Sequence, residues 1–364
     1  MPLDQVPGRP KSRRPARKKV STALYAAVDL GTNNCRLLIA EPRGMSYRVV
    51  DSYAEIARLG EGLNASGRLS DASIERAMAA LTKIRSKLKA KGVGHVRCIA
   101  TEACRKAENG AEFIARVREE TGLTFKIIGP KEEAQLALIG CHNLIDRNAE
   151  RALVVDVGGG STELSLVNAA KAREAGFKGV LEKPPILDWT SLPLGVVTLS
   201  EAFHHLPEAE AYIAMRAHAE DVFRGWKGHD TAAKAMEQGH LIGTSGTVTC
   251  LAGLHLNLDK YRRDKVDGVW LAREEAAQAI NRLREAGPEG RAAMPTIGPE
   301  RAGLMLSGCA IIDAAWDVFP AHRLRVADRG LREGLLLSMM HGPKRKRRRG
   351  GARRNKSKAK RDDG

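Results

Sequence analysis

One short segment of this chain carries most of its structural information and reads Asp156-Val157-Gly158-Gly159-Gly160-Ser161-Thr162-Glu163. It follows the apolar run 152–155, which predicts a buried strand. Three glycines leave backbone N–H groups with no Cβ in front of them, so a phosphate can approach. Ser161 and Thr162 add hydroxyl donors, while Asp156 and Glu163 add the carboxylate oxygens that suit Mg²⁺. Taken alone, the segment is also compatible with a glycine-rich hairpin that binds nothing.

The same combination of an apolar run and a small polar loop occurs twice more. Near the N-terminus the run 26–28 leads into Asp29-Leu30-Gly31-Thr32-Asn33-Asn34, and a second apolar run follows at 37–40. Downstream the chain reads Leu241-Ile242-Gly243-Thr244-Ser245-Gly246-Thr247. Three such loops, two of them led by aspartate, indicate two related half-domains that face one phosphate-binding cleft.

These loops resemble the phosphate-1 and phosphate-2 motifs of the actin, hexokinase and Hsp70 superfamily. More narrowly, the strings DLGTNNCRLLIA (29–40) and VDVGGGSTEL (155–164) resemble the exopolyphosphatase and guanosine-pentaphosphate phosphohydrolase (Ppx/GppA) family. Segments 100–109, 128–134 and 328–334 agree with it in the family's order. The similarity runs from about residue 23 to about residue 340.

The resemblance implies an α/β protein with two actin/ribonuclease H-like domains, whose mixed sheets and flanking helices surround a central phosphate-binding cleft. We expect these domains at residues 20–147 and 148–343. A β-β-β-α-β-α-β-α order is predicted over residues 25–144, and a related pattern begins again at Ala152.

The net charge of +17 is concentrated at the two ends of the chain. Residues 1–19 carry a net +6 and residues 344–364 a net +10, so the segment between them is nearly neutral. Both tails lack hydrophobic periodicity, and we expect them to be disordered. They are either solubilising ends or an electrostatic tether for a polyanion such as RNA or polyphosphate.

Composition also bears on membrane contact and on the cellular compartment of the protein. No apolar run approaches the length of a membrane span, so no membrane contact is expected. The six cysteines are scattered without a CxxC pair, which favours reduced thiols in a cytoplasmic protein. Relatives in the family are often dimers, and the resemblance therefore implies a homodimer.

The chemistry that these loops suit is phosphoryl transfer, which asks a protein mainly for positioning and charge stabilisation. We expect Mg²⁺ to be held by Asp156 and Glu163, with Asp29 reaching it through water. Arg36 and Arg105 are candidates for direct phosphate contacts, with a structural salt bridge as the alternative for each. Donors to phosphate are expected from the three loops at Gly31, Thr32, Asn33, Gly158, Gly159, Ser161, Thr162, Gly243, Thr244, Ser245, Gly246 and Thr247.

Hydrolysis also needs a base for the attacking water. Glu132 and Glu133 begin a predicted helix, where a glutamate is usually a helix-dipole partner. In the family that the chain resembles, the second glutamate of the E-E-A triplet activates water, which assigns catalysis to Glu133. Glu132 is then a first-turn residue, and Glu102 and Glu108 are the other candidates.

The leading hypothesis is an exophosphatase that releases orthophosphate from the end of inorganic polyphosphate, or the 5′ γ-phosphate from guanosine pentaphosphate. One alternative is an ATP-binding kinase or switch of the same fold, which predicts tight adenosine binding at residues 243–247. Another is an RNA-associated protein that acts through its basic tails.

Overall fold

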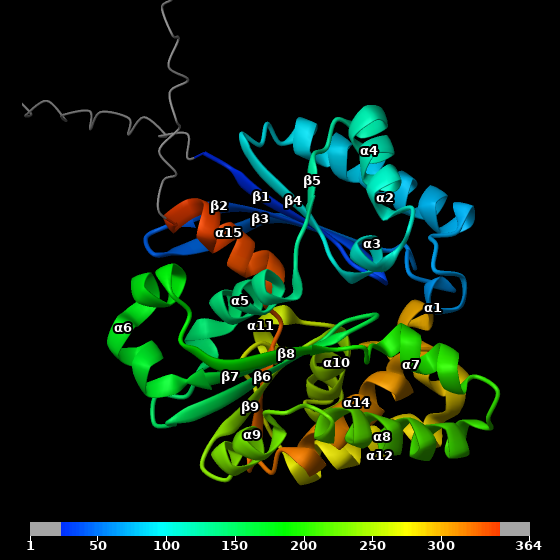
Figure 1. Cartoon of the computed structure of the whole chain (residues 1–364), viewed down its shortest axis with the longest axis vertical. Coiled ribbons are helices and arrows are strands. Elements are labelled where there is room, and N and C mark those ends of the chain that lie inside the picture. The colour runs from blue at the N-terminus through cyan, green and yellow to red at the C-terminus, as the bar shows by residue number, and fades with distance from the viewer. Residues whose placement is uncertain (1–22, 343–364) are drawn as a thin grey trace, which may run out of the picture.

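The computed structural model describes residues 23–342 and has two lobes stacked one above the other (Figure 1). The expected basic tails at 1–19 and 344–364 lie outside the described residues. Among residues 23–342, no helix is both long and apolar enough to cross a membrane. Residues 25–144 form, in order, β1 (Tyr25–Leu30), β2 (Asn34–Arg43), β3 (Ser46–Ile56), α1 (Leu63–Ser66), α2 (Asp71–Ala90), β4 (His95–Ala100), α3 (Glu102–Lys106), α4 (Gly110–Thr121), β5 (Phe125–Ile127), α5 (Pro130–Cys141) and the 3-10 helix η1 (His142–Leu144).

The second half of the chain is longer and richer in helix. Its elements are β6 (Arg151–Val157), β7 (Thr162–Asn168), α6 (Ala169–Glu182), β8 (Ile186–Leu192), α7 (Val196–Phe203), α8 (Glu208–Arg224), α9 (His229–Met236), β9 (His240–Thr244), α10 (Gly246–His255), α11 (Arg263–Val266), β10 (Trp270–Ala272), α12 (Arg273–Ala293), α13 (Pro299–Ala302), α14 (Met305–Val318), β11 (Arg323–Ala327) and α15 (Leu331–His341).

The two sheets have the same topology. The first runs β3-β2-β1-β4-β5, with β1 antiparallel to β2 and parallel to β4. The second runs β10-β11-β9-β6-β7-β8, with β6 antiparallel to β7 and parallel to β9. The added strand β10 extends one edge of the second sheet. The repeat predicted to restart at Ala152 is therefore confirmed as two mixed sheets with flanking helices.

Alternating apolar residues let each sheet bury both of its faces. In the first sheet, Val28 and Leu37 face α2 and α4, whose buried side chains include Leu81 and Val117. Helix α2 is capped by Ser70, whose side chain accepts a hydrogen bond from the Ser73 N–H at the helix start. This face forms a core of its own within the first lobe.

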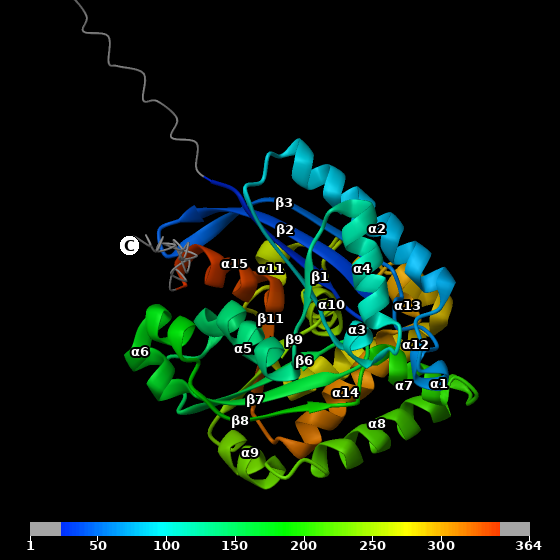
Figure 2. The same ribbon diagram turned by 45° about the horizontal axis from the view of Figure 1, so that its top comes forward.

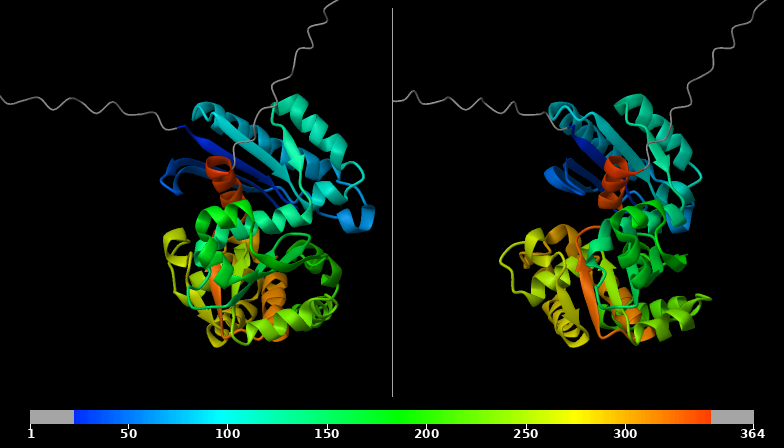
Figure 3. Two further views of the ribbon diagram at one scale, coloured as in Figure 1. Left: turned by 60° about the vertical axis from the view of Figure 1, so that its left-hand side comes forward. Right: turned by 90° about the vertical axis from the view of Figure 1, so that its left-hand side faces the viewer.

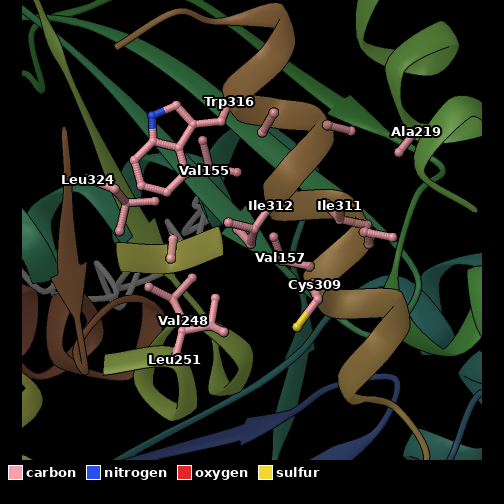
Figure 4. Close-up of a cluster of buried hydrophobic side chains, with 14 of the residues drawn as sticks. Val155, Val157, Ala219, Val248, Leu251, Cys309, Ile311, Ile312, Trp316 and Leu324 are labelled. Atoms are coloured by element: carbon pink, nitrogen blue, oxygen red, sulfur yellow. The ribbon is translucent and has the colours of Figure 1, made fainter. Parts of the chain in front are cut away.

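The second lobe has the larger core, between its sheet and helices α8, α10, α12 and α14. Figure 4 shows the part of it between β6, α10 and α14. Val155 and Val157 point from β6 toward α14, where Ile312 and Trp316 are fully buried. This core ends at the loop that follows Val157, so a rigid apolar layer supports the glycine-rich segment.

Each half of the chain sends its last helix to the sheet of the other half. Helix α5 follows β5 but packs on β6, β7 and β8, whereas α15 follows β11 and packs on β1 and β2 (Figures 1 and 2). Side views show α15 within the upper lobe, next to the strands that begin the chain (Figure 3). Although residues 331–341 belong to the second half by sequence, their packing partners lie in the first.

The two exchanged helices also cross one another closely. A Cβ placed on Gly140 would lie 2.0 Å from the Gly330 carbonyl oxygen, and one on Gly334 would lie 1.9 Å from the Leu136 carbonyl oxygen. Only glycine allows this approach of two backbones. The crossing joins α5, which packs on the second sheet, to α15, which packs on the first.

Helix α6 and strands β10 and β11 are among the elements that were not expected from the sequence. Helix α6 carries two glycines, with Gly176 at φ 58° inside it, so its sequence has weak helical character. Strands β10 and β11 are only three and five residues long, and their alternation is too brief to identify. Helix α6 follows β7, and β10 is the edge strand of the second sheet, whereas β11 pairs with β9 and places Ala327 beside Thr244.

Candidate active site

A cleft of about 410 Å³ lies between the lobes, and both halves of the chain line it. The carboxyl ends of β1, β6 and β9 face this cleft. Each of these strands is followed by one of the three predicted loops, and residues of all three loops line the cleft. Of the predicted site residues, those that line the cleft are Asp29, Gly31, Thr32, Asn33, Arg36, Glu133, Asp156, Gly158, Gly159, Ser161, Glu163, Thr244, Ser245, Gly246 and Thr247.

In the first loop, the backbone carbonyls are tied back to the segment that follows β3. The Thr32 carbonyl accepts a hydrogen bond from the Gly60 N–H at 2.8 Å, and the Asn33 carbonyl accepts one from the Ala57 N–H at 2.9 Å. Because the C=O and N–H of a trans peptide point in opposite directions, the next N–H groups in the loop face away from that segment. The loop thus presents donors rather than acceptors.

The glycine-rich loop of the second lobe is built in the same way. The Gly158 and Gly159 carbonyls accept hydrogen bonds from the Val196 and Val197 N–H groups, at 3.0 and 2.8 Å, at the start of α7. The N–H groups of Gly159 and Gly160 therefore point away from α7. Such a run of outward N–H groups is suited to an anion.

The two loops touch one another across the cleft. A Cβ on Gly159 would lie 2.9 Å from Thr32 Cβ, and a Cβ on Gly160 would lie 1.9 Å from Glu102 Oε2. The Thr32 hydroxyl donates to Glu102 Oε2 at 2.8 Å, which holds that carboxylate in place. Glycine is required at Gly159, because Thr32 Cβ and the Asn33 backbone occupy the space of a side chain there, whereas at Gly160 only the end of the Glu102 side chain does so.

The third loop ends β9 and begins α10. The Ser245 side chain caps this ten-residue helix by accepting a hydrogen bond from the Val248 N–H at 3.1 Å. The first turn of α10, which includes Gly246 and Thr247, lines the cleft and directs the positive end of the helix dipole toward it.

Three acidic side chains lie at the ends of the central strands. Asp29 is 8 % exposed, and its Oδ1 is buried with no hydrogen-bond partner among residues 23–342. Asp156 accepts a hydrogen bond from the Thr244 hydroxyl. Glu163 Oε1 accepts from the hydroxyls of Ser161 and Ser191, at 2.8 and 2.7 Å. These contacts fix Asp156 and Glu163 and leave Asp29 with an unused acceptor.

Burial raises the pKa of each of these carboxyl groups. The pKa of Asp156 rises to about 6, although its hydrogen bond from Thr244 opposes the shift. The pKa of Glu163 rises to about 7, through burial and then through the neighbouring charge of Asp156. The pKa of Asp29 is also raised by burial, with Arg36 opposing. A bound cation would relieve this crowding of negative charge.

These oxygens fit a magnesium ion that arrives together with a phosphate. Within residues 23–342, no three His, Cys, Asp or Glu side chains form a metal centre by themselves. Magnesium usually takes only one or two protein carboxylates and completes its shell with water and substrate phosphates. The hard oxygens of Asp156 and Glu163 and the unpartnered Oδ1 of Asp29 provide such a partial set.

Glu133 lies in the first turn of α5 and faces the cleft with 8 % exposure. Burial and the charge of Glu163 raise its pKa well above the ordinary value, and Arg105 opposes that rise. Arg105 Nη1 lies 3.4 Å from Glu133 Oε2 and donates to the Ile128 carbonyl at 2.7 Å. Arg105 was predicted to contact phosphate, but the structure places it behind Glu133 rather than on the cleft wall.

Two other predicted phosphate ligands do not line the cleft. Thr162 is fully buried and its hydroxyl donates to the Leu194 carbonyl. Gly243 lies inside β9, where a Cβ would come within 2.9 Å of the Val248 side chain. Both residues support the loops from behind.

Sequence reasoning assigned no role to several charged residues that line the cleft. Arg263, Arg301, Arg332 and Glu333 are among them, and two of these lie in the segment 328–334. Glu333 is 1 % exposed and accepts hydrogen bonds from Arg263 at 2.8 Å and from the Gly330 N–H at 2.9 Å. A charged residue outside a recognisable motif is usually a solvated surface residue, so the sequence pattern alone did not single these residues out.

Comparisons with known proteins agree with this fold. The model of the Ppx/GppA phosphatase family matches residues 38–342. The crystal structure of the Aquifex aeolicus member of the Ppx/GppA family is similar, at 27 % identity and a TM-score of 0.68, over 87 % of this chain and 97 % of that one. An exopolyphosphatase-like protein is similar at 25 % identity and a TM-score of 0.72, over 88 % of this chain and 99 % of its own.

A further structure supports the fold alone. The exopolyphosphatase from Cytophaga hutchinsonii is 23 % identical, with a TM-score of 0.77, over 88 % of this chain and 99 % of that protein. The similarity covers both lobes, which are the whole of the described region.

Proposed function

The chain belongs to the Ppx/GppA phosphatase family, and from that premise we propose that it is an exopolyphosphatase that releases terminal orthophosphate from inorganic polyphosphate. The observation that carries the proposal is the position of Glu133. Its buried carboxylate faces the same cleft as the donor groups of the glycine loops, and Arg105 holds it from behind. A base and an anion cradle thus share one cavity.

The residues divide the reaction between them. The N–H groups of the loops after β1, β6 and β9 bind the terminal phosphoryl group and stabilise charge on its oxygens. Glu133 takes a proton from water as the water oxygen bonds to the terminal phosphorus. The bond from that phosphorus to the bridging oxygen breaks, and the shortened chain leaves with the bonding electrons. The raised pKa of Glu133 makes it a better proton acceptor.

Magnesium is part of this proposal. Asp156 and Glu163 would hold the ion, with Asp29 reaching it through water, and a bound ion would neutralise charge on the phosphate oxygens. Guanosine pentaphosphate is a possible second substrate, because its scissile bond is also a terminal phosphoanhydride. A homodimer, a cytoplasmic location and a polyanion contact through the tails stay predictions.

The test is orthophosphate release with Mg²⁺ from long-chain polyphosphate, guanosine pentaphosphate and ATP in parallel. We expect Glu133→Ala to lower turnover by about 10²–10⁴-fold while substrate binding is largely kept. Glu132→Ala is the matched control, because Glu132 lies in the same turn but pairs with Lys126 and Arg97 on the outside. Its rate should change by less than about threefold.

Each outcome has a clear meaning. Near-normal turnover of Glu133→Ala would refute the role of Glu133 as base. Tight binding of ATP with negligible hydrolysis of all three substrates would favour a kinase or switch. Salt-steep RNA binding that disappears on removal of residues 1–19 and 344–364, without phosphate release, would favour an RNA-associated protein.

A further inference from the structure

A glutamate from each lobe reaches across to the backbone of the other lobe where the first two loops meet. The carboxylate of Glu102, at the start of α3, lies against Gly160, because a Cβ added there would come within 1.9 Å of Glu102 Oε2. In the opposite direction, Glu201 of α7 accepts a hydrogen bond from the Gly62 N–H at 2.9 Å, directly before α1. Helices α1 and α7 lie side by side in Figures 1 and 2. The two lobes are thus joined by a reciprocal pair of contacts.

Thr32 of the first loop lies between these contacts and is held on three sides. Its methyl group meets Gly60, where an added Cβ would come within 2.3 Å of Cγ2, and its Cβ meets Gly159 of the other lobe. Its hydroxyl donates to Glu102 Oε2 at 2.8 Å, and the residue is 5 % exposed. The hydroxyl that was predicted to contact phosphate is therefore engaged with Glu102, which leaves the backbone N–H groups of the loop for an anion.

Each glutamate belongs to a helix that is tied to the loop of its own lobe. The Thr101 N–H, directly before Glu102, donates to the carbonyl of Leu30 at 3.1 Å, and Leu30 immediately precedes the first loop. The first two N–H groups of α7 donate to the glycine-rich loop in the same manner. The contacts across the cleft therefore act on the distance between the two loops. A displacement of about 1 Å in a reacting geometry can cost about 100-fold in rate.

The carboxylate of Glu102 has no partner that neutralises its charge. Among residues 23–342 it is in no ion pair, and the Thr32 hydroxyl is its only hydrogen-bond donor. It lines the same cleft as Glu133. A base needs the charge of a carboxylate, whereas a spacer needs only its length and an oxygen that accepts from Thr32. The two roles can therefore be separated by a change that removes the charge and keeps the shape.

We propose that Glu102 is a positioning residue, which sets the spacing of the first two loops by bridging Thr32 and Gly160. The contact between Glu201 and Gly62 supports the same spacing from the other lobe, but it is exposed to water and contributes less. Two loops at a fixed distance can hold one phosphoryl group from both sides at once. The inference rests on the proposed function for the reaction, while the same spacing also governs the binding of a simple anion.

Steady-state kinetics of orthophosphate release from long-chain polyphosphate with Mg²⁺ tests the bridge. We expect Glu102→Ala to lower kcat by about 10- to 100-fold. Glu102→Gln should stay within about threefold of the unchanged protein, because its amide oxygen still accepts from Thr32. Thr32→Val removes the hydroxyl and keeps the shape, and the double variant with Glu102→Ala should be no slower than Glu102→Ala alone. The matched control is Glu112→Ala, which removes an exposed first-turn glutamate from α4.

Calorimetric titration with orthophosphate and Mg²⁺ adds a measurement that does not depend on turnover. Glu102→Ala should weaken this binding by about 3- to 10-fold, Glu102→Gln should not, and the thermal midpoints of both variants should match that of the control. Rescue by glutamine together with non-additive effects of the Thr32 and Glu102 changes supports the bridge.

Three results would overturn the inference. They are normal turnover of Glu102→Ala, a Glu102→Gln variant as slow as Glu102→Ala, and additive effects of the Thr32 and Glu102 changes. The second of these would assign the charge of Glu102 to the reaction instead of its length. Absence of turnover in the unchanged protein, with orthophosphate binding weakened in Glu102→Ala alone, would refute the proposed function and leave the bridge in place.

Discussion

The two aspartate-led loops occupy equivalent places in sheets of the same topology, but the residues that face the aspartates differ in charge. In the first sheet Asp29 is paired with Arg36 across β1 and β2. In the second, Asp156 is paired with Glu163 across β6 and β7. The partner follows seven residues after the aspartate in both cases. One lobe thus offers a cation beside its loop, and the other a second carboxylate.

This difference suggests how a repeated unit has been divided between two tasks. Phosphate oxygens need positive charge, which we propose that Arg36 supplies, whereas a divalent cation needs oxygens, for which we propose Asp156 and Glu163. The donor N–H groups of the loops are common to both halves because they are made by the backbone. The difference in charge lies at one equivalent strand position in each sheet.

Among the changes that test this comparison of the two loops, the largest effect should come from removing the extra carboxylate. Glu163→Gln keeps the shape and an acceptor for the hydroxyls of Ser161 and Ser191 but removes the charge. We expect orthophosphate release to fall by about 10²–10³-fold and half-activation to need more Mg²⁺. Initial rates measured over a magnesium titration test this.

The matched change in the first lobe is Arg36→Gln. It should weaken substrate binding while leaving the magnesium dependence unchanged, because Arg36 is assigned to phosphate. The proposed division of tasks would be wrong if the two variants shifted the magnesium requirement alike.

A smaller effect, on stability, tests whether the exchanged helices are equivalent. Gly140→Ala and Gly334→Ala each place a Cβ against the backbone of the other helix. We expect each to lower the free energy of unfolding by about 1–3 kcal/mol, as overpacking does. Chemical denaturation measures this, with Gly303→Ala as control. Gly303 has helical φ and ψ and no atom near its added Cβ, so stability should not fall.

The smallest effect is on the pH dependence of stability without metal. Folding raises the pKa of Asp156 to about 6 and that of Glu163 to about 7. The native state therefore binds protons more tightly than the unfolded chain, and stability falls as pH rises. The contribution of Glu163 is fully present below about pH 4.5 and is lost as pH rises through about 7.

Thermal unfolding in a chelator should show the midpoint falling by a few degrees across this window. Glu163→Gln should flatten the fall, and Mg²⁺ should remove part of it by binding the ionised form. A midpoint that rises with pH in the same window would contradict the raised pKa values.

Much of this architecture could be predicted from the sequence, and its limits have physical causes. The three loops could be identified because each follows an apolar strand and consists of small residues, and two of them begin with an aspartate. As expected, the loops bring Asp29, Asp156 and Glu163 to one cleft. Thr162 was predicted to bind phosphate because the sequence does not show whether a loop hydroxyl faces the cleft or the protein interior. Only the structure shows that it donates to the Leu194 carbonyl.

Other features depend on which surfaces meet. The periodicity of α5 and α15 shows that each buries one face, but periodicity does not name the sheet that covers it. The exchange of these helices was therefore outside the reach of pattern alone. Arg105 illustrates the same limit, since an arginine suited to phosphate is equally suited to hold Glu133.

The exchange of α5 and α15 bears on the order in which the protein can form during synthesis. The face of β1 and β2 that carries Ala27 and Leu38 is covered by Leu335 and Leu336, some 300 residues later in the chain. Until α15 leaves the ribosome, the helix that covers this apolar face in the folded protein is missing. The first lobe is thus synthesised first, but its packing is completed only when the last helix has been synthesised. Until then, the exposed apolar face makes the nascent chain prone to aggregation.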